Sequence, residues 1–174
     1  MLKPLIPIVR LVRHRFAPDS RRLVSDRTMQ NLATLVATGE RLHSGEIRIC
    51  IESRLPNSYL LRPEAIQTVT RCRAVAQFSK LRVWDTEHNN GVLIYLQLAE
   101  RAIEIVADRG LESHVTPVMW QAMALRLSTF LRNGQFETGL SQAVAEVSAV
   151  LIQHYPVPVG AENQNELPDL PSRY

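Results

Sequence analysis

The sequence predicts an α/β fold, namely a three-layer α/β/α sandwich with a mixed central sheet that contains one antiparallel hairpin. Three observations carry this prediction. Segments with helical and strand periodicity follow the order helix, strand, helix, strand, strand, helix, helix. Residues 92–98 form an almost unbroken apolar run, which is typical of a strand buried on both faces. Only residues 99–101 separate this run from the next strand, 102–107, so the two strands must be antiparallel, because a parallel return needs a much longer crossover.

The length and composition place the chain among ordinary globular proteins. Its 174 residues fit one domain with a proper core, and it is 45% hydrophobic and 21% charged. The net charge of +3 is mild, and the basic excess is concentrated in residues 3–27. A nucleic-acid binder usually carries a basic stripe with interleaved aromatic residues, so we expect no nucleic-acid partner. Neither a Walker loop nor a dinucleotide-binding glycine motif is present, and we expect no organic cofactor.

The cysteines and the apolar runs bear on the compartment. Cys50 and Cys72 lack metal-site spacing and favour reduced thiols in a reducing compartment, although a disulfide between them stays open. The sequence shows no apolar run of membrane-spanning length and no signal peptide at its N-terminus. We therefore expect a cytoplasmic protein that can lie peripherally at the inner face of the membrane.

Residues 1–18 are interpreted as a basic amphipathic N-terminal arm. Pro4 and Pro7 confine a helix to the part after Pro7, and apolar and basic residues are mixed from Leu5 to Phe16. One interpretation is a short helix packed on the domain, or a loosely held arm. The alternative is a segment that contacts an anionic membrane surface or a membrane-associated partner protein.

The next segments supply two helices around one strand. Ser25 or Asp26 can cap a helix that extends to about residue 43. Residues 46–53 then alternate between isoleucine and polar side chains, which predicts a strand with one buried face. A proline suits the first turn of a helix, and this predicts a helix over residues 63–80.

The chain after the hairpin is predicted to form two helices and a tail. Thr116 and Pro117 mark the start of a helix that reaches residue 132, and residues 136–155 form the last helix. These elements define a domain over residues 19–155. Residues 156–174 are rich in proline and polar residues, and we expect them to form a flexible tail.

Polar residues gather at one end of the predicted hairpin. The loop before its first strand and the turn after its second strand must emerge together, because the strands are antiparallel. Carboxylate and amide oxygens suit hard cations such as Ca²⁺ or Mg²⁺, and two acids with a metal can activate water beside a phosphoryl group. The candidate cation ligands are Asp85, Glu87, Asn89, Asn90 and Asp108. Asp85 and Asp108 are also the candidate catalytic acids. The alternative is a solvated turn, which the Asn-Asn-Gly sequence also favours.

Neighbours of this loop complete the candidate site. His88 and Arg109 are candidate ligand-binding residues, and Arg109 can pair with Asp85, with Glu87 or with an anionic ligand. Trp84 is expected to pack beneath the loop and fix it. Structural support for the loop is assigned to Trp84, Gly91 and Gly110. The histidines are expected at the surface.

The stretch LRVWDTEHNNGVLIYLQLAERAIEIVADRG, residues 81–110, resembles the TPM domain family. That family is named for a thylakoid lumen protein, a photosystem II repair protein and a nematode receptor-modulating protein. The upstream strand SGEIRICIES, Trp120 in the following helix, the GQF of residues 134–136 and Gly139 extend the resemblance. Together these features span residues 27–155.

The resemblance implies a three-layer fold with functional residues at one end of a mixed sheet. Some plant members of the family are described as acid phosphatases, and some bacterial members as divalent-metal or calcium binders. By position, the implicated acidic and amide groups correspond to Asp85, Asn89, Asn90 and Asp108. Many relatives carry an export signal and a membrane helix or Gly-rich tail; this chain resembles the shorter cytosolic bacterial form. We therefore expect a divalent-cation-binding or interaction module without strong catalysis, and the alternatives are a weak metal-assisted acid phosphatase and an adaptor at a membrane surface.

Overall fold

The structure, a computed structural model, describes residues 5–158, 160, 163 and 165–174. The first four residues of the predicted N-terminal arm, and four of the predicted tail (159, 161, 162 and 164), lie outside the described residues. The elements are α1 (Leu5–Arg15), α2 (Ser20–Leu23), α3 (Asp26–Glu40), β1 (Ile47–Glu52), α4 (Asn57–Leu60), α5 (Ile66–Lys80), β2 (Val92–Gln97), β3 (Ala102–Ala107), the 3₁₀ helix η1 (Arg109–Leu111), α6 (Pro117–Arg132), α7 (Phe136–His154) and β4 (Ser172–Arg173).

The central sheet has four strands in the order β3-β2-β1-β4. β1 and β2 are parallel, with Ile47 opposite Val92, and β2 and β3 form the predicted antiparallel hairpin, with Val92 opposite Ala107. The connection from β1 to β2 contains α5, as a parallel crossover requires. The start of β1, the start of β2 and the end of β3 therefore meet at one end of the sheet, which we call the polar end. The turn of the hairpin lies at the opposite end.

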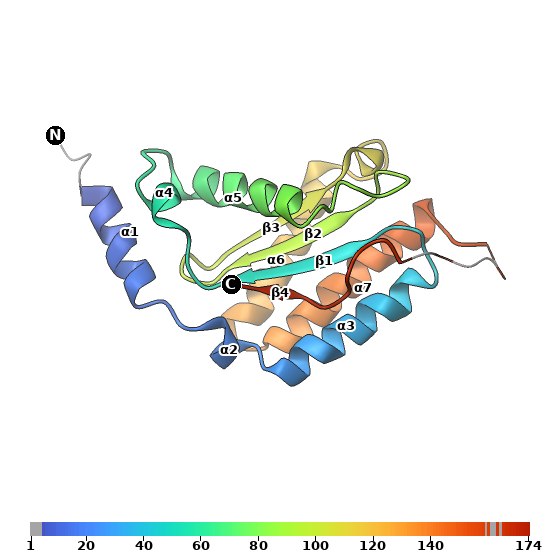
Figure 1. The fold of residues 1–174 in the computed structure, drawn as a ribbon, viewed down its shortest axis with the longest axis horizontal. Helices are drawn as coiled ribbons and strands as arrows, with labels where there is room; N and C mark the ends of the chain where they lie inside the picture. Colours follow the sequence, from blue (N-terminus) through green and yellow to red (C-terminus); the bar gives the residue numbers. More distant parts are fainter. Residues whose placement is uncertain (1–4, 159, 161–162, 164) are drawn as a thin grey trace.

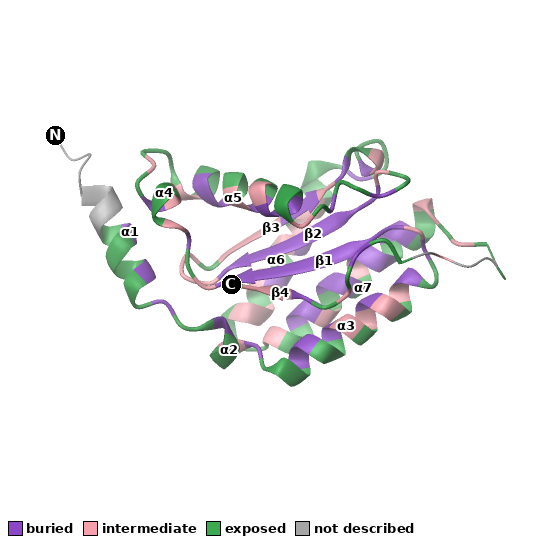
Figure 2. Ribbon diagram, in the orientation of Figure 1, coloured by how far each residue is buried: buried purple, intermediate pink, exposed green. Residues whose placement is uncertain are grey.

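Helices cover both faces of the sheet, so the predicted three-layer sandwich is confirmed. Figure 1 shows α5 on one face and α3, α6 and α7 on the other. Side chains of β1 alternate between the two cores: Ile47, Ile49 and Ile51 pack with α3 and α7, whereas Cys50 packs with α5. Both faces of β1 and β2 are buried (Figure 2). The apolar run of β2 predicts this, whereas the alternating pattern of β1 predicted only one buried face. The polar face of β1 is also buried, because α5 covers it and Glu52 is paired with Arg73 there. Cys50 is buried, Cys72 is exposed, and both are free thiols.

The predicted start is confirmed for α3, confirmed in part for α6, and wrong for α5. The Ser25 hydroxyl accepts a hydrogen bond from the Thr28 N–H (3.1 Å) and caps α3. Pro117 opens α6 as predicted, but the Thr116 hydroxyl makes no capping hydrogen bond within the described residues. However, α5 begins at Ile66 and not at the expected Pro63, because the carbonyls on either side of that proline accept hydrogen bonds from the Arg10 guanidinium instead.

The C-terminal segment is attached to the domain, where we expected a flexible tail. β4 pairs in parallel with β1, with Ser172 opposite Cys50. Leu167 is buried, and its N–H donates to the Glu46 carboxylate (3.3 Å). The reason for this attachment is that the outer edge of β1 carries backbone donors and acceptors that need partners. The predicted domain boundary at residue 155 therefore does not separate the folded part from the rest.

The N-terminal arm forms α1, which packs on the domain through its polar side. The Arg10 guanidinium is buried and donates to the Arg62 and Glu64 carbonyl oxygens (2.9 and 2.6 Å). His14 was expected at the surface, but it is buried, and its Nδ1 accepts a hydrogen bond from the Leu55 N–H (3.0 Å). The arm is therefore held by specific hydrogen bonds to buried groups.

Candidate functional site at the polar end of the sheet

Backbone hydrogen bonds bring the loop before β2 and the turn after β3 into direct contact. The Asp108 N–H donates to the Gly91 carbonyl (2.9 Å), and the Gly110 N–H donates to the Asn89 carbonyl (2.9 Å). The Val92 N–H donates to a carbonyl just before β1 (2.8 Å). Three segments that are distant in the sequence thus meet at this end, as the hairpin predicts.

Asn90 is fully buried and only partly satisfied. Its backbone N–H donates to the Thr86 hydroxyl (3.1 Å), and its side-chain Nδ2 donates to the Ser44 hydroxyl (3.3 Å). Its Oδ1 has no hydrogen-bond partner among the described residues. A buried amide oxygen in this state costs about 1–3 kcal/mol, and it is ready to accept a ligand donor or a cation.

Asp108 presents the second unpaired oxygen. Its Oδ1 accepts a hydrogen bond from the Arg109 N–H (2.8 Å) and thereby caps η1. Its Oδ2 is buried and has no partner within the described part of the chain. Asp108 also lines a cavity of about 910 Å³ between the edge strand β3 and α6. This carboxylate therefore combines burial with access to a cavity.

The other acidic candidates face solvent. Asp85 forms an ion pair with Arg82, three residues earlier, and its side chain is 42% exposed. Glu87 is exposed, and its backbone N–H donates to the Glu166 carboxylate (3.0 Å). His88 is exposed as well. The structure therefore keeps these three side chains at the surface, whereas the two unpaired oxygens are buried.

Arg109 does not make the ion pairs that we expected. Its Nε donates to the Asn89 side-chain oxygen (3.1 Å), and Asp85 is held instead by Arg82. The neighbour three residues away is the closer partner, because the two lie in one tight turn. Asn89 has φ 53°, in the left-handed region that asparagine tolerates better than most residues. This conformation turns its side chain toward Arg109.

The support beneath the loop comes from Val83 and not from Trp84. Val83 is fully buried, whereas Trp84 is 49% exposed and its indole N–H donates to the Ser79 carbonyl (3.3 Å). Gly91 is required here, because a Cβ atom would lie 2.0 Å from the Val83 carbonyl oxygen. A Cβ atom on Gly110 would lie 2.6 Å from the backbone of the same loop. The close approach of the two segments thus depends on both glycines.

Three buried titratable residues at this end were not anticipated. Burial, and then the neighbouring Glu46 carboxylate, raise the pKa of Glu40 to about 8. Burial raises the pKa of Glu46 to about 7, although backbone N–H groups of the C-terminal segment hydrogen-bond to it. Burial lowers the pKa of His43 to about 4, and its Nδ1 lies 2.9 Å from the Gly45 carbonyl oxygen. Their positions at a helix end and in a connection gave no sequence signal of burial.

Aromatic residues from the end of α7 close this region. The Tyr155 hydroxyl donates to the Gly110 carbonyl (2.6 Å), and burial raises the pKa of Tyr155. His114 stacks on His154 at 4.4 Å between ring centroids. His154 reaches this end because α7 returns to it.

The polar end carries individual carboxylate and amide oxygens that can act as acceptors. Over the described ranges, no group of three histidine, cysteine, aspartate or glutamate side chains lies close enough together to hold a metal ion. The loop before β2 and the turn after β3 instead carry two buried oxygens without partners among the described residues, the Asn90 amide oxygen and one Asp108 carboxylate oxygen, and Glu40 Oε2 is a further one at this end. Each of these oxygens can accept a hydrogen bond from a small ligand or contribute to the coordination of a partly hydrated hard cation.

A family model described as the TPM domain matches residues 18–150. The chain belongs to the TPM domain family. The match covers both sides of the polar end, including the loop before β2 and the turn after β3. The resemblance seen in residues 81–110 is thereby confirmed. No curated protein matches the chain.

Two solved structures show the fold of this TPM domain. The NMR structure of the BA42 protein from the psychrophilic bacterium Bizionia argentinensis is 22% identical, with a TM-score of 0.70, over 86% of this chain and 94% of that chain. The solution NMR structure of the N-terminal domain of a protein from P. gingivalis is 20% identical, with a TM-score of 0.59, over 89% of this chain and 96% of that chain. None of the described helices is both long and apolar enough to cross a bilayer.

Proposed function

We propose that this TPM domain binds a divalent cation at its polar end. The observation that supports the proposal is the presence of two buried oxygens without partners, Asn90 Oδ1 and Asp108 Oδ2. Burying each oxygen without a partner destabilises the fold by about 1–3 kcal/mol, and a bound cation would remove this cost. Carboxylate and amide oxygens are the ligands that Ca²⁺ and Mg²⁺ prefer.

The available oxygens fit a cation that keeps much of its water. Asp108 would supply a charged ligand oxygen and Asn90 a neutral one. The Ser44 hydroxyl, which lies beside the Asn90 side chain, would be a further oxygen ligand. Mg²⁺ in particular retains several waters and needs few protein ligands. Because only one buried carboxylate contributes, we expect weak binding, with a Kd on the order of 10⁻⁴–10⁻³ M. The exposed Asp85 and Glu87 are not ligands in this proposal.

Calorimetric titration of the full chain with Ca²⁺, Mg²⁺ and Mn²⁺ tests the proposal. Asp108→Asn should abolish the heat of binding, because it removes the only charged ligand. Asp85→Asn is the matched control, since it removes an exposed acid from the same loop and should leave binding intact. Neither heat nor a thermal shift at millimolar cation, or unchanged binding by Asp108→Asn, would contradict the proposal. Weak phosphomonoester hydrolysis at acid pH, the alternative activity, would use the same cation and Asp108.

A second candidate function is contact with a membrane surface through α1. Arg10 and His14 of this helix are buried against the domain, whereas Val9, Val12 and the adjoining Phe16 are 55%, 54% and 80% exposed. Arg13 and Arg15 flank this apolar face and are exposed to solvent. An apolar face bordered by arginines is typical of a helix that lies on an anionic bilayer.

Flotation with anionic phospholipid vesicles tests this second function. The double variant Val12→Glu and Phe16→Glu should lose vesicle binding, and it leaves the inward hydrogen bonds of α1 in place. The matched control is Val118→Glu with Leu125→Glu, which changes two exposed apolar residues of α6. Equal flotation of both double variants would exclude a membrane role for α1.

A further inference from the structure

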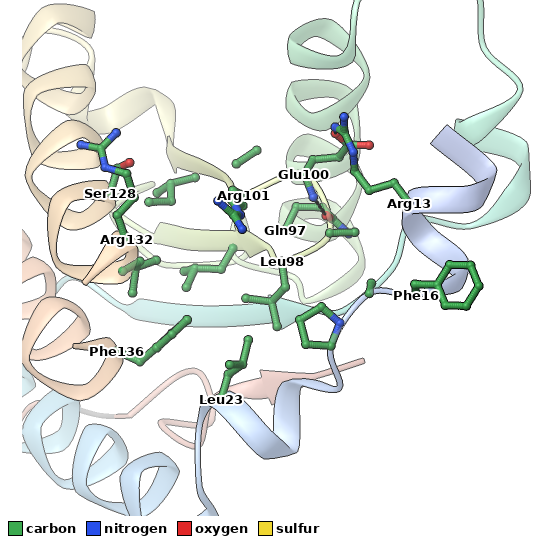
Figure 3. Close-up of a pocket in the computed structure, with 17 residues that line it drawn as sticks. Arg13, Phe16, Leu23, Gln97, Leu98, Glu100, Arg101, Ser128, Arg132 and Phe136 are labelled. Carbon is green, nitrogen blue, oxygen red and sulfur yellow. Dashed lines mark hydrogen bonds and ion pairs between the residues drawn. The ribbon is translucent and has the colours of Figure 1, made fainter. Parts of the chain in front are cut away.

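A second pocket lies at the end of the sheet opposite the polar end. It has a volume of about 700 Å³, and it is bounded by the turn of the hairpin, α6, the start of α7 and the segment that follows α1. This size is typical of pockets that bind small organic ligands. We call it the hairpin-turn pocket (Figure 3). No role at the polar end depends on it.

The charged lining of this pocket is predominantly cationic. Arg13, Arg101 and Arg132 line it, and Glu100 is its only carboxylate within the described residues. Glu100 is already neutralised, because it is buried between Arg13 and His14. The Arg101 guanidinium has no hydrogen-bond or ion-pair partner in the described part of the chain, and Arg132 donates only to a threonine hydroxyl there. The pocket thus has two arginines without acidic partners.

A buried polar group also lines the hairpin-turn pocket. Gln97 is 1% exposed, and its Oε1 accepts a hydrogen bond from the Glu100 N–H (2.9 Å). Its Nε2 has no partner among the described residues. An amide N–H₂ without a partner costs free energy, and it requires an acceptor. A ligand anion would satisfy it together with an arginine.

The remaining walls are apolar. Leu23, Leu98, Ile103, Leu131 and Phe136 contribute hydrocarbon surface to the pocket. In Figure 3, Leu23 and Phe136 point toward the space below Arg101, whereas Phe16 points away from it. Cationic donors and hydrocarbon walls in one pocket match a ligand that has an anionic head and an apolar chain.

The backbone at Arg101 supports a role for its side chain. Arg101 has φ 52°, and its N–H donates to the Leu98 carbonyl (3.2 Å) to close the turn. Glycine or asparagine is preferred at such a left-handed position, because a larger side chain is strained there. An arginine that occupies this strained position and lines a cationic pocket is consistent with a use for its guanidinium.

We propose that the hairpin-turn pocket binds a single-chain anionic amphiphile, of which a long-chain fatty acid is the simplest example. The carboxylate accepts hydrogen bonds from Arg101 and from Gln97 Nε2. The hydrocarbon chain lies along the apolar walls between the hairpin and the start of α7. This site is separate from the proposed cation site, and it does not require α1 to touch a bilayer.

Titration of the full chain with dodecanoate below its micelle concentration tests this proposal. We expect saturable binding of one dodecanoate, with much weaker binding of dodecanol, which lacks the charge. Arg101→Gly should weaken dodecanoate binding by roughly tenfold, the effect of one lost charge-assisted hydrogen bond. It should not lower the melting temperature, because glycine relieves the strained turn. The matched control is Arg82→Gly, an exposed arginine that also has positive φ (57°) but lies at the polar end.

The results of this titration distinguish a fatty-acid site in the hairpin-turn pocket from membrane binding through α1 and from the cation site. Equal affinity of Arg101→Gly and wild type for dodecanoate would overturn it, and so would equal affinity for dodecanol. Binding only to anionic vesicles, without binding of monomeric dodecanoate, would also overturn it and would assign the effect to α1. Asp108→Asn should retain dodecanoate binding, so failure of the cation proposal leaves this measurement unaffected.

Discussion

Raising the pH from about 5 to about 8 should destabilise the fold, because two buried carboxyl groups then have to stay protonated or ionise in place. Glu40 is 5% exposed and Glu46 is 1% exposed. Glu40 Oε1 accepts the Ile47 N–H (3.0 Å), but its Oε2 has no partner among the described residues. The unpaired oxygen is the one that carries the proton most readily. Substitution of Glu40 by glutamine keeps the acceptor and removes the ionisation.

The loss of stability with rising pH follows from the raised pKa values of Glu40 and Glu46. Below the ordinary pKa of 4.5 both the folded and the unfolded chain hold these protons, and the contribution of Glu40 and Glu46 to stability is greatest. As the pH rises above 4.5, the unfolded chain releases them while the folded chain retains them, up to about pH 7 for Glu46 and about pH 8 for Glu40. The contribution of these two groups to stability falls through this window and levels off above it. A rise of the Glu40 pKa from 4.5 to about 8 sets an upper limit of roughly 5 kcal/mol on its contribution.

Urea unfolding at a series of pH values measures this effect. His43 contributes the opposite slope, because its pKa is lowered to about 4 and stability is lost as the pH falls below its ordinary value of 6.5. The informative quantity is therefore the difference between Glu40→Gln and wild type. It should be near zero at about pH 4 and should favour the variant by several kcal/mol at about pH 8.

The control for this measurement is a variant at an exposed carboxyl group. Glu112→Gln changes an exposed carboxyl and should give a curve parallel to that of wild type. If the difference between Glu40→Gln and wild type is independent of pH, the Glu40 carboxyl does not retain its proton in the folded state. The description of Glu40 and Glu46 as buried neighbours would then be wrong.

Three further predictions concern other parts of the fold. Arg73 donates to both carboxylate oxygens of the buried Glu52, so Arg73→Met should lower the free energy of unfolding by about 3–5 kcal/mol, measured by urea titration. Gly91→Ala places a Cβ atom 2.0 Å from the Val83 carbonyl oxygen and should lower the melting temperature severely; an unchanged melting temperature would show that the loop can move apart. Hydrolysis of a phosphomonoester at acid pH, if present, should disappear in Asp108→Asn, and persistence would point to another site or a contaminant.

The sequence predicted the elements whose signals are local. The strand at residues 46–53, the hairpin at 92–107 and the helix capped by Ser25 all have periodicity or capping that needs no knowledge of the rest of the chain. β4 is different, because two residues carry no periodicity, and its pairing depends on an edge that exists only once β1 is in the sheet. The start of α5 was misplaced for the same reason, since Arg10 competes for the carbonyls there.

The candidate residues at the polar end show which properties the sequence predicts and which it does not. Antiparallel pairing alone predicts that the loop before β2 meets the turn after β3, and the Asp108 N–H to Gly91 carbonyl hydrogen bond follows from it. Whether a side-chain oxygen is satisfied depends instead on the neighbours that folding supplies. Asp85 is paired by Arg82 within its own turn, whereas Asp108 keeps one oxygen unpaired. Residue type could not separate these two aspartates.

The hairpin-turn pocket was missed because its charge is assembled from distant segments. Composition places the basic excess near the start of the chain, and no single arginine of the hairpin or of α6 indicates a site in the sequence. Folding brings Arg13, Arg101 and Arg132 to one opening. Among the described residues, the only carboxylate that lines it is Glu100, which is already paired with Arg13 and a histidine. Local net charge therefore depends on which charges are already paired. That is a property of the tertiary structure, and it is why the pocket attracts an anion although the whole chain is only mildly basic.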